Sequence, residues 1–253
     1  MLAASASVWG ATILAVLAVS AIAFVGIVVL VVQERLLLRI VPILVSFAVG
    51  ALLGDALFHI LPELAVDGGL TEGISWVMAL SILFFFVLEK VIHLHHQLHA
   101  PEHRHVHPVV LTNLLGDGVH NFVDGAIIAG SFLVSTSLGI ATTIAVALHE
   151  IPQEMGDLGV LVHAGLSPRR ALAYNVASAI TALLGAVIAL LLAGAIDGIE
   201  RPLLAISAGA FIYIAGSDLI PELHKGTSIR TGVVQFLGIA AGFAVMAALL
   251  AIE

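Results

Sequence analysis

The feature that most restricts the fold of this chain is a series of eight apolar segments, each long enough to cross a lipid bilayer as a helix. A spanning helix needs about 20 consecutive, mostly apolar residues. Such segments cover residues 11–32, 40–62, 74–92, 109–133, 138–163, 171–194, 203–222 and 231–252, with short polar breaks between them. The sequence therefore predicts an all-α fold: a polytopic integral membrane bundle of eight transmembrane helices, forming a single domain over residues 1–253.

The composition excludes several other classes of protein. Of the 253 residues, 60% are hydrophobic and only 10% are charged, whereas a soluble domain has about 25% charged residues. The chain has no cysteine, which excludes a disulfide-stabilised secreted scaffold. Its nine Lys and Arg residues against seventeen Asp and Glu residues disfavour a nucleic-acid-binding protein. We therefore expect the lipid bilayer as a partner and no nucleic acid.

The distribution of basic residues predicts the orientation in the membrane. The breaks after segments one, three, five and seven, together with the last turn of segment three, contain Arg35, Arg39, Lys90, Arg104, Arg169, Arg170, Lys225 and Arg230, and the other breaks contain only Arg201. Because basic loops stay in the cytoplasm, both termini are expected outside it, as in a bacterial inner (plasma) membrane protein. No Lys or Arg precedes the first segment, so we interpret it as a span and not as a signal peptide.

Two of the segments share a sequence pattern. GALLGDALFHILPEL (Gly50 to Leu64) and GAFIYIAGSDLIPEL (Gly209 to Leu223) both begin with Gly-Ala and end with Pro-Glu-Leu at the same spacing. The two segments cross the membrane in opposite directions, which is typical of the inverted-topology repeats of transporters. Chance recurrence of a Pro-terminated helix is the alternative interpretation.

The fourth and fifth segments carry an unusual number of acidic residues, namely Asp117, Asp124, Glu150, Glu154 and Asp157. Five carboxylates facing lipid would cost about 12–17 kcal/mol on insertion scales, which exceeds the net stability of most folds. They must therefore face the bundle interior. Neither segment contains Lys or Arg, so we expect a bound cation to compensate their charge.

Helical spacing groups the candidate ligands of that cation. His120 and Asp124 share one helix face because they are four residues apart, with Asp117 one turn earlier and Asn121 beside them. On the fifth segment, His149 pairs with Gln153, and Glu150 pairs with Glu154 on a face rotated by about 100°. Imidazole and carboxylate ligands without thiolates suit Zn²⁺, with Fe²⁺, Mn²⁺, Co²⁺ and Cd²⁺ as alternatives.

Pro152 lies between these ligands. A proline inside a helix removes one backbone hydrogen bond and frees a carbonyl group, here near residue 148. Such a group is tolerated within a membrane where it lines a cavity. We interpret Pro152 as part of a metal-binding cavity, and an ordinary kink relieved by neighbouring helices is the alternative.

The motifs HNFVDG (His120 to Gly125) and HEIPQEMGD (His149 to Asp157) resemble the paired motifs of the ZIP (Zrt/Irt-like) family of metal transporters. They are most similar to those of its histidine-rich subfamily, HNFxDG and HExPHExGD. The resemblance implies a carrier and not an enzyme. It implies that a divalent metal, usually zinc, moves into the cytoplasm by elevator-type alternating access through a binuclear site between spans 4 and 5.

By motif position, the resemblance assigns the transport-site ligands to His120, Asn121, Asp124, His149, Glu150 and Gln153, and a metal-facing position to His59. One residue departs from the subfamily pattern, because Gln153 stands where that pattern has His. An amide oxygen is a weaker ligand than an imidazole nitrogen. The second metal position and the choice of metal are therefore left open by the sequence.

Two other functions are compatible with parts of these motifs. HEIPQ is one residue short of the HExxH signature of zinc proteases, but it lacks the second histidine and contains Pro152, so an intramembrane metalloprotease is disfavoured. The spacing of His120 and Asp124 is similar to that in cation-diffusion efflux carriers, so outward transport is the stronger alternative.

A homodimer is the candidate assembly.

A histidine-rich break separates the third and fourth segments. Residues 93–108 contain His93, His95, His96, His99, His103, His105 and His107, which are seven of the twelve histidines in the chain. Clustered imidazoles bind Zn²⁺, and the charge distribution predicts that this loop is cytoplasmic. We expect it to receive, buffer or sense metal at the exit of the carrier, and a solvated linker is the alternative.

Overall fold

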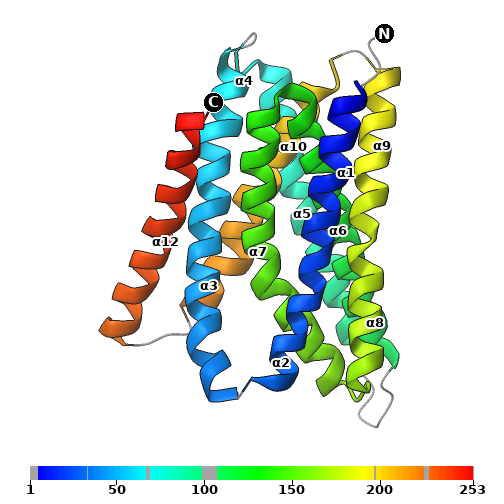
Figure 1. Ribbon diagram of the computed structural model, residues 1–253, viewed down its shortest axis with the longest axis vertical. Coiled ribbons are helices and arrows are strands. Elements are labelled where there is room, and N and C mark those ends of the chain that lie inside the picture. Colours follow the sequence, from blue (N-terminus) through cyan, green and yellow to red (C-terminus); the bar gives the residue numbers. More distant parts are fainter. Residues whose placement is uncertain are drawn as a thin grey trace.

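The computed structural model describes residues 5–32, 34–66, 69–98, 107–196, 198–224 and 228–252. Within these ranges the chain forms helices and no strand, arranged as eight rods side by side (Figure 1). In chain order the rods are α1 (Ala6–Ser20) with η1 (Ala21–Gly26) and α2 (Ile27–Val31); α3 (Glu34–Asp55) with η2 (Ala56–Ile60) and α4 (Leu61–Val66); α5 (Glu72–Leu98); α6 (His107–Val134); α7 (Thr136–His163); α8 (Pro168–Ala179) with α9 (Thr181–Ala195); α10 (Glu200–Tyr213) with η3 (Ile214–Leu219) and α11 (Ile220–Leu223); and α12 (Ile229–Leu249) with η4 (Leu250–Ile252).

Six of these rods are long and apolar enough to cross a membrane. They are Ala6–Gly26, Arg39–Val66, Glu72–Val91, Pro168–Ala195, Glu200–Leu223 and Ile229–Leu249. The other two rods, α6 and α7, have 28 residues each and contain the acidic residues singled out in the sequence. The chain is thus an all-helical membrane protein with six candidate spanning helices among the described residues.

The connections hold neighbouring rods antiparallel. Only Ser135 separates α6 from α7, and its hydroxyl accepts a hydrogen bond of 3.1 Å from the backbone N–H of Leu138, which caps the start of α7. Between α7 and α8, Gly165 adopts a φ of +96°, which favours glycine. The single-residue turn at Ser135 places α6 directly against α7, so ligands on the two helices can meet.

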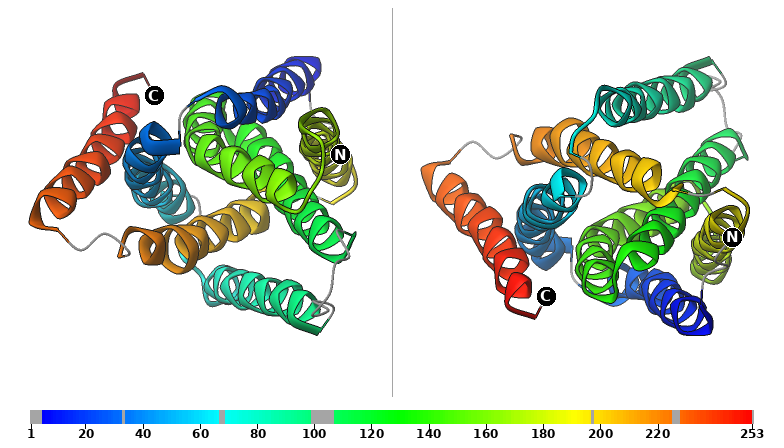
Figure 2. Two further views of the ribbon diagram at one scale, coloured as in Figure 1. Left: turned by 90° about the horizontal axis from the view of Figure 1, so that it is seen from below. Right: turned by 90° about the horizontal axis from the view of Figure 1, so that it is seen from above.

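Both chain termini lie at one end of the bundle (Figure 1). We name the opposite end, which carries Arg39, Lys90, Arg169, Arg170 and Arg230, the basic end. The rods divide into two groups when viewed along the bundle (Figure 2). One contains α1, α6, α7 and α8–α9, and the other contains α3, α5, α10 and α12, with α3 packed against α7 where the groups meet.

Glycines permit the closest helix contacts within each group. A Cβ atom on Gly125 of α6 would lie 1.8 Å from the carbonyl oxygen of Ala182, and one on Gly185 of α9 would lie 1.8 Å from that of Phe122. A Cβ on Gly50 of α3 would lie 2.1 Å from the carbonyl oxygen of Ile239 on α12. Small residues at membrane helix crossings allow such backbone approach.

The two segments that share a sequence pattern also share a distortion. In each, a π-helix (η2 or η3) precedes the proline, and the hydrogen bonds that end these turns run from Leu61 N to Ala56 O and from Ile220 N to Ala215 O. These atoms stand at equivalent positions of the two sequences. A π-turn relieves the backbone where a following proline cannot donate a hydrogen bond.

The histidine-rich segment is shorter than the predicted loop, 93–108. Helix α5 continues past residue 92 to Leu98, and α6 begins at His107. The backbone of His93, His95 and His96 is therefore helical, whereas His99, His103 and His105 lie outside the described residues.

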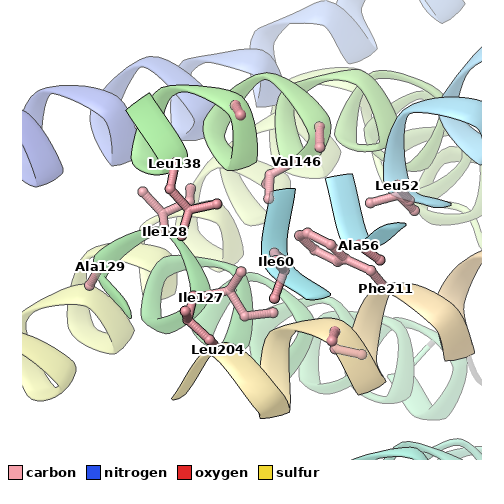
Figure 3. Packing of buried hydrophobic residues seen from close by; sticks show 14 of the residues in the cluster. Leu52, Ala56, Ile60, Ile127, Ile128, Ala129, Leu138, Val146, Leu204 and Phe211 are labelled. Carbon is pink, nitrogen blue, oxygen red and sulfur yellow. The ribbon is translucent and has the colours of Figure 1, made fainter. Parts of the chain in front are cut away.

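The apolar core fills the half of the bundle nearer the termini. Figure 3 shows Leu52 and Ile60 of the α3 rod, Ile127 of α6, Val146 of α7 and Phe211 of α10 packed together. Phe211, Leu52 and Ile60 are completely buried. A buried polar pair lies beside this cluster, where the hydroxyl of Thr142 on α7 donates a hydrogen bond of 2.9 Å to Asp55 Oδ2 of α3.

Candidate metal centre

Four side chains from α6 and α7 converge in the middle of the bundle. His120 and Asp124 come from α6, and His149 and Glu150 come from α7. One ligand atom from each residue lies within 4.8 Å of the other three. The i, i+4 spacing on α6 and the adjacent pair on α7 place all four on the seam between the two antiparallel helices.

The separations match a metal site. His149 Nε2 lies 3.1 Å from His120 Nε2, 3.2 Å from Asp124 Oδ2 and 3.7 Å from Glu150 Oε1. His120 Nε2 lies 3.6 Å from both Asp124 Oδ2 and Glu150 Oε1. Tetrahedral Zn²⁺ with ligand bonds of about 2.0–2.1 Å separates its ligand atoms by about 3.3–3.4 Å. The four atoms therefore already stand close to the positions that a tetrahedral ion requires.

The burial of the carboxylates also favours a cation. Asp124 and Glu150 are each 1% exposed, and both oxygens of Asp124 and Oε1 of Glu150 accept no hydrogen bond from the described residues. A buried carboxylate without a partner is costly. A divalent ion between these oxygens would provide the missing electrostatic partner.

One imidazole is oriented for ligation by the backbone. The Nδ1–H of His149 donates to the carbonyl oxygen of Ala145, 3.3 Å away and one turn earlier on α7. This arrangement leaves the lone pair on Nε2, the atom that faces His120 and Asp124. A metal-binding histidine is commonly held in this way by a hydrogen bond to its second nitrogen. Phe211 packs edge-on against the same ring, with centroids 6.4 Å apart.

Asp117 and Asn121 bind each other. The Nδ2 amide of Asn121 donates to Asp117 Oδ1 at 2.7 Å and to the Asp117 carbonyl at 3.1 Å, so this amide is turned away from the four ligands. The hydroxyl of Ser178 on α8 donates to the other carboxylate oxygen of Asp117. The sequence indicated Asp117 and Asn121 as candidate ligands but gave no role to Ser178.

Glu154 also finds its partner on α8. The Nδ2 amide of Asn175 donates to Glu154 Oε2, and it lies 3.4 Å from the carbonyl oxygen of Ala23 in η1. Asn175 and Ser178 are polar residues three positions apart on α8. That spacing places them on one helix face, and it could have indicated that α8 completes the polar environment.

A cavity of about 500 Å³ extends from His120, one of the four ligands, toward the basic end of the bundle. His120 lines it together with Asp117, Gln153 and Asp157. Its further lining includes Glu89 and Tyr213, whose hydroxyl donates to the Glu89 carboxylate, and Glu222. All these residues lie on the halves of their helices nearer the basic end. A cation in the cavity would meet acidic and amide oxygens along its length.

The remaining candidates lie elsewhere. Gln153 lines the cavity together with His120. His59 is buried, and its Nε2 lies 2.9 Å from the carbonyl oxygen of Met246 on α12. Helix α7 continues through Pro152, which also lines the cavity. The side chains of the seven histidines between 93 and 107 lie outside the described residues.

Comparison with known proteins identifies similar chains. The profile of the family described as ZIP zinc transporters matches residues 95–250, which is more than half of the chain. Zinc transporter ZIP13 of Pongo abelii is 35% identical over 219 residues, covering 80% of this chain and 65% of its own length. Zinc transporter ZIP4 of Homo sapiens is 41% identical over 142 residues, and zinc transporter ZIP10 of Danio rerio is 37% identical over 140 residues. These two matches cover 55% and 53% of this chain but only 22% and 16% of those longer proteins.

Proposed function

Because the chain belongs to the family of ZIP zinc transporters, we propose that it carries a divalent transition metal, preferentially Zn²⁺, across the membrane into the cytoplasm. The ion binds between His120, Asp124, His149 and Glu150. One observation carries the proposal: two imidazole nitrogens and two buried carboxylate oxygens converge within 4.8 Å, and these carboxylate oxygens accept no hydrogen bond from the described residues. The metal is the transported substrate, and no covalent chemistry is involved.

All eight rods cross the bilayer in this proposal. A helix of 28 residues is about 42 Å long, so α6 and α7 exceed the hydrocarbon thickness of about 30 Å. The acidic side chains of α6 and α7 keep these helices from qualifying as apolar spans by composition. These side chains face one another and the cavity, not lipid. The eight-to-one distribution of basic residues then places the basic end in the cytoplasm and both termini outside.

Access to the ion alternates between the two sides. The cavity reaches His120 from the basic end, which corresponds to a state open to the cytoplasm. On the other side, Leu52, Ile60, Val146 and Phe211 pack together (Figure 3), and in this proposal they close the path between the ligands and the outside. A hydrated cation cannot pass through side chains that are packed this closely, so a second state must open them.

An inverted repeat in the helix arrangement explains how the chain could reach that second state. Exchanging rod 1 with 6, 2 with 7, 3 with 8 and 4 with 5 preserves the helix contacts: α3 packs on α12 as α10 packs on α5, and η1 packs on α7 as α9 packs on α6. The matching π-turns of η2 and η3 follow the same exchange. Repeats of this kind allow one helix group to move against the other, and here α1, α6, α7 and α8–α9 would carry the ion past the other group.

The test is zinc uptake into proteoliposomes. The purified chain is reconstituted with a zinc-sensitive dye inside the vesicles, and wild type is compared with His149→Ala and with His224→Ala. We expect His149→Ala to lose more than about 90% of the uptake, because removal of one imidazole weakens Zn²⁺ binding by an order of magnitude or more. His224→Ala also removes one imidazole, but outside the site, and should transport at the wild-type rate.

Direction is measured in the same vesicles. The chain has no cysteine, so a single Ser5→Cys substitution reports which end faces outward through an impermeant thiol reagent. Net import requires flux from the side of the termini to the basic end. Flux only in the reverse direction under physiological ion gradients would favour the efflux function. Membership of a transporter family removes the protease alternative.

A further inference from the structure

A groove on the surface of the bundle lies between α6 and the α8–α9 rod. Two adjoining cavities of about 470 and 580 Å³ form it, and they share Leu114 and Tyr174. The deeper part is apolar and is lined by residues such as Leu115, Val119 and Leu184, all of which are substantially exposed. The part nearest the basic end contains Arg170. This groove is separate from the cavity of the metal site.

Helix packing explains the shape of the groove. The contacts of Gly125 and Gly185 bring α6 and α9 to backbone distance near the middle of the bundle. A Cβ on Gly118, two turns closer to the basic end, would meet only Thr181 side-chain atoms at 3.7 Å or more. The helices therefore separate toward the basic end. From Thr181 to Arg170 the helix rises about 16 Å, the depth of one leaflet of a bilayer with a hydrocarbon core of about 30 Å.

The wide end of the groove is positively charged. Arg170 lines it and has no ion-pair partner among the described residues. Arg170 stands in the first turn of α8, which contains no acidic residue and begins after Ser167 without a side-chain cap. The free backbone N–H groups at such a terminus add positive potential. Tyr174, one turn further, places an aromatic ring with a polar tip at the level where the groove becomes apolar.

We propose that this groove binds one anionic phospholipid from the leaflet at the basic end. Arg170 contacts the phosphate, and one acyl chain lies along Leu114, Leu115 and Val119. A soluble anion would use the Arg170 end but leave the apolar part empty. A peptide would leave its backbone groups unpaired in an apolar groove that faces the bilayer. Only a lipid matches both the charge at one end and the leaflet-long apolar surface.

The proposed lipid is one helix away from the ion. Ser178 lines the groove and also donates its hydroxyl hydrogen bond to Asp117, which lines the metal cavity on the other side of α6. Thr181 fixes the same crossing through a 2.5 Å hydrogen bond to the carbonyl oxygen of Gly118. An acyl chain between α6 and α8 would hold this spacing. The lipid site itself does not depend on the proposed function, whereas its effect on transport does.

Native mass spectrometry of the full chain in detergent tests the proposal. The protein is titrated with phosphatidylglycerol and with phosphatidylcholine of identical acyl chains, using wild type, Arg170→Ala and Arg169→Ala. Arg169 is the matched control, because it is the adjacent arginine of the same helix turn but does not line the groove. We expect one phosphatidylglycerol to bind at least about tenfold more tightly than phosphatidylcholine, and Arg170→Ala to remove that preference. Arg169→Ala should change it less than about twofold.

A second variant tests the apolar part. Val119→Phe narrows the groove without changing charge, and it should weaken binding of both lipids, with thermal unfolding confirming that the variant is folded. Equal affinity of wild type for the two lipids, or equal loss in Arg169→Ala and Arg170→Ala, would overturn the proposal. Competition by inorganic phosphate at millimolar concentration would also overturn it, because the site would then bind a free anion. The binding readout is independent of zinc uptake, so it can fail while transport is intact.

Discussion

The Nε2 atoms of His120 and His149 face each other at 3.1 Å, with the two imidazole rings inclined at 77°. Two neutral nitrogens with lone pairs turned toward each other repel, so either a proton or a cation must lie between them. His149 keeps its Nδ1–H on the carbonyl oxygen of Ala145, which favours a free lone pair on Nε2. Proton and metal therefore compete for the same position.

The first prediction is that Zn²⁺ affinity falls as pH falls from 7 to 5. Imidazole titrates near pH 6.5 and carboxyl groups near pH 4 in water, and each ligand must lose its proton before it binds the metal. The sign follows directly: protonation removes ligands, so binding is strongest above this range and is lost as pH decreases through it. Isothermal titration calorimetry at several pH values, in buffers of different ionisation enthalpy, measures both affinity and released protons. An affinity that is constant over the range would contradict a His and carboxylate site.

The second prediction concerns Gln153. Its replacement by His adds an imidazole to the cavity wall one turn from His149. We expect about tenfold tighter Zn²⁺ binding, because imidazole is a better Zn²⁺ ligand than an amide, together with slower release and slower uptake. Gln153→Asn keeps the amide and serves as the control. Unchanged affinity in Gln153→His would mean that this side chain does not reach the ion.

The third prediction separates the site from the histidine-rich segment. Replacing His93, His95, His96, His99, His103, His105 and His107 with Ser removes none of the four converging ligands. This variant should keep substantial uptake in cells but change its response to high cytosolic zinc. His120→Ala or Glu150→Ala should lose most uptake at normal expression, because each removes one ligand and leaves buried carboxylates without their full partnership. If the serine variant loses uptake as completely as His120→Ala, the histidines lie on the obligatory path.

The fourth prediction concerns helix packing on α9. Gly185→Ala forces a Cβ into a position 1.8 Å from the carbonyl oxygen of Phe122, so α6 and α9 must separate, at a cost of about 1–3 kcal/mol or more. Gly194→Ala on the same helix meets no atom within 4 Å and should change stability by no more than about 1 kcal/mol. Thermal unfolding of the two variants in one detergent compares them. Similar midpoints for both would contradict the close contact.

The positions of the helices follow from the sequence to within a few residues. Each of the eight apolar segments corresponds to one rod, because burying an unpaired backbone in lipid is prohibitive and a helix is the local solution. Six of the rods can be identified as candidate membrane spans from their length and hydropathy alone. Helices α6 and α7 do not, and their polar residues, such as Asp124 and His149, are the ones that indicated the site. The third segment, 74–92, matches the candidate span Glu72–Val91, and α5 continues beyond that span to Leu98.

The sequence by itself also determined which residues could share a helix face, and hence that His120 and Asp124 could act together. Only the tertiary structure decided which faces meet. It joins His149 and Glu150 to them, although the two are adjacent in sequence, because both flank the seam between α6 and α7. It turns Asn121 toward Asp117 and Glu154 toward Asn175, because α8 lies against these residues and offers Ser178 and Asn175 as donors. Periodicity fixes directions around one helix axis, whereas partners on other helices depend on packing distances that no local pattern contains.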